Sequence, residues 1–76
     1  MKKRYRLVEA RGHRTQIEIA RMCGVAQQTY SHWETGRQSP PIKKMLLLER
    51  VLGVPKEELF VDIFNSEIEL PTKEVG

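Results

Sequence analysis

Two short helix-like segments, each ended by a glycine, follow one another between residues 15 and 36. They limit the fold that this chain can adopt more than any other feature of the sequence. Thr15 and Glu18 have the spacing of a capping box, in which each side chain bonds the other residue's backbone amide. The apolar residues that follow share one stripe at helical spacing: Ile19, Ala20 and Cys23. Gly24 can adopt the left-handed conformation that ends a helix. A first helix of about eight residues is therefore predicted.

The second segment has two unlike sides. Tyr30 and Trp33 recur at i, i+3, and Gly36 provides an end. The opposite side carries side chains that hydrogen-bond well but contribute little to a core: Gln27, Gln28, Ser31 and His32. We predict a short helix that two aromatic rings anchor on the inside and whose outer side is free.

Helical periodicity also appears before and after this pair. Residues 4–11, 42–52 and 56–60 are predicted to form three further helices. The expected fold is all-α, a compact five-helix bundle within a domain of residues 1–60. Residues 61–76 mix apolar and acidic side chains without a clear period, and we expect an acidic C-terminal extension there.

The charges are divided unevenly along the chain. Residues 1–50 carry 11 Lys and Arg against 4 Asp and Glu, a net charge of +7, whereas residues 51–76 carry 2 against 6, a net charge of −4. A basic body suits a polyanionic partner, although an uneven solvated surface explains the same numbers. The basic residues near the start, including Arg4 and Arg6, fit either a flexible arm along a nucleic-acid backbone or a solubilising terminus.

Several functional classes find no support in the sequence. No apolar run approaches the roughly 20 residues that cross a bilayer, and the basic start lacks the features of a signal peptide. We therefore expect a cytoplasmic protein that does not associate with a membrane. One cysteine and two histidines make neither a disulfide nor a zinc site, and no cofactor is predicted. No nucleophile and base pair, metal set or phosphate loop suggests an enzyme.

The helix pair has the layout that places one helix in the major groove of DNA. A groove about 12 Å wide admits a helix only if that helix protrudes from its domain. Its inner side must then be anchored while its outer side hydrogen-bonds base edges. The aromatic and glutamine-bearing sides of the second helix meet both requirements.

A longer pattern runs through most of the chain. Its residues are Thr15, Gln16, Glu18, Ala20, Gly24, Val25, Trp33, Glu34, Gly36, Pro40, Leu52, Gly53, Val54, Glu58, Leu59 and Phe60. This pattern resembles the Cro/repressor (XRE-type) helix-turn-helix domain over about residues 5–60. The resemblance implies a five-helix bundle, with the helix-turn-helix at helices two and three, that binds operator DNA as a symmetric dimer.

The resemblance also implies roles for individual residues. Base contacts are expected from Gln27, Gln28, Thr29, Ser31 and His32. Phosphate contacts are expected from Gln16, Arg37, Lys43 and Lys44, and Gln16 is also expected to brace the reading helix. A structural ion pair is expected between Arg11 and Glu34.

Among the departures from the family pattern, two concern the start of the reading helix and the packing of the fourth helix. Ala26 stands where Ser or Thr usually caps the reading helix, which costs about 1 kcal/mol of helix stability. Glu49 stands where a small apolar residue is usual, so we expect it to pair with an arginine or to face a partner subunit.

The leading functional hypothesis is a transcriptional regulator, a repressor in the first instance, that binds a pseudo-palindromic operator as a homodimer. The alternative is an antitoxin or interaction module of a mobile element, in which the acidic tail binds a protein partner. RNA binding is less favoured, because no exposed aromatic platform accompanies the basic residues.

Overall fold

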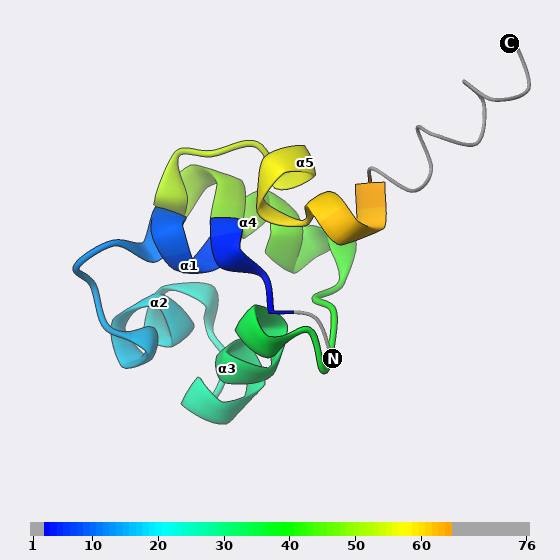
Figure 1. The fold of residues 1–76 in the computed structure, drawn as a ribbon. Coiled ribbons are helices and arrows are strands. Elements are labelled where there is room, and N and C mark those ends of the chain that lie inside the picture. The colour runs from blue at the N-terminus through cyan, green and yellow to red at the C-terminus, as the bar shows by residue number, and fades with distance from the viewer. Residues whose placement is uncertain (1–2, 65–76) are drawn as a thin grey trace, which may run out of the picture.

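The computed structural model describes residues 3–64, and five helices form the body of this part of the chain (Figure 1). They are α1 (Tyr5–Arg11), α2 (Gln16–Cys23), α3 (Gln27–Thr35), α4 (Ile42–Leu52) and α5 (Lys56–Leu59). The described residues contain no strand. The predicted all-α five-helix bundle is confirmed, and α2 and α3 are the expected helix pair.

Local hydrogen bonds fix both ends of α2 and the turn that leads to α3. At the start of α2, the Glu18 amide donates to Thr15 Oγ1 at 3.1 Å and the Thr15 amide donates to Glu18 Oε1 at 2.8 Å, which completes the capping box. At its end Gly24 adopts φ 71° and ψ 32°, a left-handed conformation that glycine tolerates best. The Val25 amide then donates to the Ala20 carbonyl at 3.0 Å. The sequence signals at 15–25 therefore act locally, as predicted.

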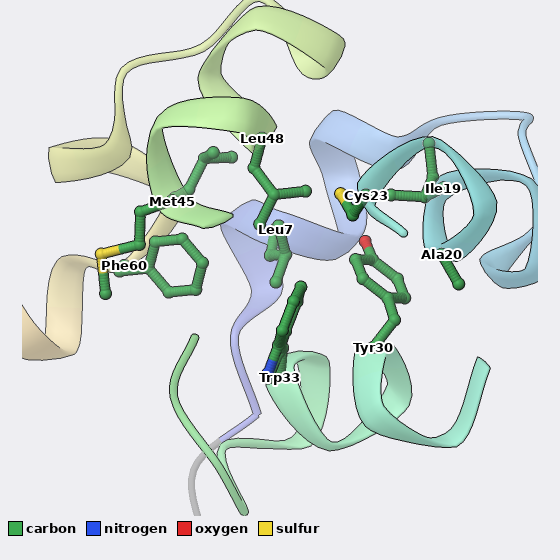
Figure 2. Close-up of a cluster of buried hydrophobic side chains, with 10 residues drawn as sticks. Leu7, Ile19, Ala20, Cys23, Tyr30, Trp33, Met45, Leu48 and Phe60 are labelled. Atoms are coloured by element: carbon green, nitrogen blue, oxygen red, sulfur yellow. The ribbon is translucent and has the colours of Figure 1, made fainter. Parts of the chain in front are cut away.

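A single core joins the helices (Figure 2). Its buried members are Leu7, Ile19, Ala20, Cys23, Tyr30, Trp33, Met45, Leu48, Leu59 and Phe60. Tyr30 and Trp33 project from α3 toward α1, α2 and α4, with ring centroids 5.9 Å apart in an edge-to-face arrangement. The aromatic side of α3 is thus its anchor on the domain.

The packed part of the chain extends past Phe60. Residues 61–64 form one more helical turn, and the amides of Ile63 and Phe64 donate to the Phe60 carbonyl at 2.9 and 3.1 Å. Both side chains pack against the core. The rest of the acidic extension, residues 65–76, lies outside the described residues.

Glu49 serves the start of α5. Its Oε2 accepts from the Lys56 amide at 2.6 Å and lies 3.7 Å from Lys56 Nζ. Of the two expectations for Glu49, the pairing with an arginine is wrong, and the contact with a partner subunit stays a prediction. The start of α5 has no side-chain cap of its own and takes a carboxylate from the preceding helix instead.

Three observations concern metal binding, thiol reactivity and membrane insertion. No group of three His, Cys, Asp or Glu among them could hold a metal ion. Cys23 is 1% exposed, and burial raises the pKa of its thiol, which keeps the sulfur protonated and unreactive. Within residues 3–64, no helix combines the length and the apolar character needed to span a membrane.

Tyr30 carries a polar atom that the core does not use. Its hydroxyl is buried without a hydrogen-bond partner among residues 3–64. Burial, followed by the neighbouring Glu34 carboxylate, raises the pKa of Tyr30 far above its usual value. We expect Tyr30→Phe to leave the free energy of unfolding unchanged or to raise it by up to about 1 kcal/mol, because a desolvated hydroxyl is removed. Urea unfolding measures this, and a loss above about 1 kcal/mol would contradict it.

Candidate nucleic-acid interface

Helix α3 lies along one edge of the molecule and is divided between the core and solvent (Figure 1). Tyr30, Trp33 and Glu34 are buried, whereas Gln27 and Gln28 at the N-terminal tip are exposed. The other residues expected to contact bases are half-buried: Thr29, Ser31 and His32. The helix is therefore held from inside, and its first turn presents two exposed amide side chains to a ligand.

A chain of side-chain hydrogen bonds links the tip of α3 to α2 and α1. Gln27 Nε2 donates to Gln16 Oε1 at 3.0 Å, and Gln16 Nε2 donates to Glu34 Oε1 at 2.8 Å. Arg11 Nε donates to Glu34 Oε2 at 2.7 Å, and Arg11 Nη1 donates to the Arg14 carbonyl at 2.9 Å. The structure thus brings together Arg11 and Glu34 as an ion pair, and Gln16 with Gln27 of α3.

The position of Glu34 makes this network rigid. Glu34 is only 2% exposed, and the Arg11 guanidinium is the positive charge that neutralises it. The hydrogen bond to Glu34 raises the pKa of Arg11, so the guanidinium remains protonated at any physiological pH. Because a buried carboxylate with a bonded partner on each oxygen has little freedom to move, Gln16 and through it Gln27 are held in place.

The amide of Gln27 keeps hydrogen-bonding capacity after this contact. Its Nε2 has a second proton and its Oε1 is an acceptor, the donor and acceptor pair that matches the major-groove edge of adenine. Gln28 is exposed and forms no side-chain hydrogen bond within the described part of the chain. One glutamine is therefore oriented in advance and the other is free to adjust.

The start of α3 lacks a side-chain cap, as the sequence indicated. Ala26 occupies the N-cap with φ −70° and ψ 152° and supplies no side-chain acceptor. The first-turn amides of an uncapped helix can bind an anion, because the helix dipole and the free N–H groups both favour negative charge. The tip of α3 is thus suited to a phosphate beside the glutamines.

The candidate phosphate contacts fall into two groups. Arg37 and Lys43 are exposed, and neither makes a hydrogen bond to another described residue. Lys44 instead donates from Nζ to the Cys23 carbonyl at 2.7 Å, where its charge stabilises the C-terminal end of α2. Gln16 is half-buried and engaged in the network above.

Sequence reasoning missed Arg4. This residue is 6% exposed and belongs neither to a flexible arm nor to a solubilising terminus. Its guanidinium stacks over the Phe60 ring, with Cζ 5.2 Å from the ring centroid. Its polar partners lie between 29 and 58 residues away in sequence, so no local pattern could have identified it.

The comparison with known families agrees with this architecture. A model of the helix-turn-helix family matches residues 3–59, from just before α1 to the end of α5. No curated protein and no solved structure gives a significant match. The matched region contains helices α1 to α5 and covers most of the chain. The chain therefore belongs to the XRE-type helix-turn-helix family of DNA-binding regulators.

Proposed function

We propose that this protein is a sequence-specific regulator of transcription, acting as a repressor, that reads the major groove of double-stranded DNA with α3. The observation that carries the proposal is the division of α3: Gln27 and Gln28 are exposed at its tip while Tyr30, Trp33 and Glu34 are buried beneath. An anchored helix with free amides at its leading turn can enter a groove without losing its support on the domain.

The glutamines are the residues that would discriminate bases. A glutamine amide pairs bidentately with adenine N6 and N7, and it bonds guanine less specifically. Gln27 meets a base with its orientation already set by Gln16, 3.0 Å away. Thr29 can offer its methyl group to a thymine, and Ser31 and His32, one turn further on, reach bases or backbone at the edge of the contact.

Arg37 and Lys43 would fix the protein on the DNA backbone. We expect Arg37→Ala and Lys43→Ala each to weaken binding to all duplexes alike and to reduce the slope of log K against log salt by about 0.9, because one released counterion is lost per phosphate contact. Titrations at several salt concentrations measure this. Arg50→Ala, which removes another exposed charge of α4, is the matched control and should leave the slope unchanged. Equal slopes in all four proteins would refute the assignment.

A symmetric homodimer is part of the proposal. Two copies would place their α3 helices about 34 Å apart, one turn of DNA, and would require a pseudo-palindromic operator. A repressor of this kind acts in the cytoplasm by occupying the operator. Sedimentation at micromolar concentration tests the dimer, and a monomer with and without operator would contradict it.

The alternative function, an antitoxin or interaction module, depends on the acidic tail. Because Ile63 and Phe64 pack on the core, the deletion that tests it begins at residue 65. A regulator should retain operator affinity without residues 65–76. An antitoxin should retain operator affinity but lose its protein partner.

Selection of bound duplexes from a random pool tests the proposed function as a whole. We expect enrichment of one motif with two inverted half-sites separated by about one helical turn. Recovered sequences that match the composition of the input pool would show that the protein does not read bases.

A further inference from the structure

We propose that Arg4 is a positioning residue for DNA binding, which holds the α3–α4 loop and with it Arg37 in the place where a phosphate is met. The inference rests on the proposed function. The C-terminal turn, residues 61–64, then helps to hold that loop in place.

Arg4 uses every donor of its guanidinium. Nη1 donates to the Trp33 carbonyl at 2.7 Å and to the Gln38 carbonyl at 2.8 Å. Nη2 donates to Ser39 Oγ at 2.9 Å and to Asp62 Oδ2 at 3.1 Å, and Nε donates to Asp62 Oδ1 at 3.1 Å. A guanidinium has five N–H groups, and all five are bonded. Arg4 therefore has no donor left for DNA, and any effect it has on DNA binding must pass through its partners.

Three of those partners define the loop that follows α3. The Trp33 carbonyl belongs to the last turn of the helix, where carbonyls lack a helical partner, and Gln38 and Ser39 are consecutive residues of the loop that follows. The backbone amide of Arg4 adds a bond to the Glu34 carbonyl at 2.7 Å. One buried side chain thus ties the end of the reading helix to the segment directly after Arg37.

Asp62 supplies the negative charge that this arrangement requires. A buried guanidinium is costly without a carboxylate partner, and the Arg4 side chain is only 4% exposed. Asp62 lies in the helical turn of residues 61–64, at the opposite end of the described chain. The docked C-terminal turn therefore supplies the counter-charge of the side chain that holds the loop.

The experiment measures the salt dependence of binding to a random duplex for Arg4→Lys, alone and combined with Arg37→Ala. Lysine keeps the charge but cannot span three acceptors on different segments. We expect Arg4→Lys to reduce the slope of log K against log salt by about 0.9, as Arg37→Ala does, and the double variant to show no further reduction. Lys43 lies in α4, which Met45 anchors in the core independently of the loop. When Arg4→Lys is combined with Lys43→Ala, the reductions in slope of the two variants should therefore add.

Asp62→Asn is the second variant and removes the charge without changing the size of the side chain. It should act in the same direction as Arg4→Lys and serves in its place if thermal unfolding shows that Arg4→Lys does not fold. An unchanged slope in the variants of Arg4 and Asp62, or full additivity with Arg37→Ala, would overturn the positioning role. So would an unchanged slope in Arg37→Ala itself. Failure of the wild-type protein to bind any duplex would instead refute the proposed function.

Discussion

Replacement of Glu34 by alanine is expected to lower the free energy of unfolding by about 3 kcal/mol, a large part of the 5–15 kcal/mol typical of a domain. Glu34 is 2% exposed and accepts hydrogen bonds from both Arg11 and Gln16. Its loss leaves the Arg11 guanidinium without its counter-charge. We take the lower end of the range for a broken buried pair because the Arg11 side chain is 20% exposed and can turn toward water.

Urea unfolding followed by the fluorescence of Trp33 measures this effect, since Trp33 is the single tryptophan and is buried. Glu34→Gln keeps the shape and one acceptor and should lose less. Glu9→Ala, which removes an exposed carboxylate from α1, is the matched control and should change stability by less than about 0.5 kcal/mol. If Glu34→Ala were as mild as the control, the network beneath α3 would not stabilise the fold.

Gln27→Ala and Gln28→Ala are each expected to weaken binding to the selected operator by about 1–3 kcal/mol while binding to a random duplex changes little. The reason is that both amides are exposed at the tip of α3, where they meet base edges rather than phosphates. Competition titrations of operator against random duplex provide the measurement.

Gln16→Ala separates orientation from contact. It removes the acceptor 3.0 Å from Gln27 Nε2 but leaves the Gln27 amide available to a base. We expect a loss of operator affinity smaller than that of Gln27→Ala and no additional loss when the two are combined. Additive losses would show that Gln16 acts on DNA independently of Gln27.

The helix pair at the centre of this account could be predicted because its signals are local. The capping box at Thr15 and the glycine that ends α2 act over a few residues, and the spacing of Tyr30 and Trp33 determines which side of α3 is buried. The exposure of Gln27 and Gln28 follows from that spacing, since they lie on the opposite side of the same short helix.

The contacts that fix the site in space were harder to predict. Arg4 reaches Asp62 across 58 residues, and Lys44 reaches the end of α2 across 21. Such pairs depend on how helices pack, and sequence periodicity carries no information on which charged side chain will meet which carbonyl. The predicted pairing of Glu49 with an arginine was wrong for the same reason, because packing placed Lys56 beside it instead.

Substitution of each operator base pair in turn tests most directly whether the amides at the tip of α3 distinguish base pairs. At one position in each half-site, we expect substitution of the base pair to lower the affinity of the wild-type protein but not that of Gln27→Ala. At the remaining positions, substitutions should lower the affinity of the two proteins equally. An identical pattern of losses in the wild type and in both glutamine variants would contradict the claim.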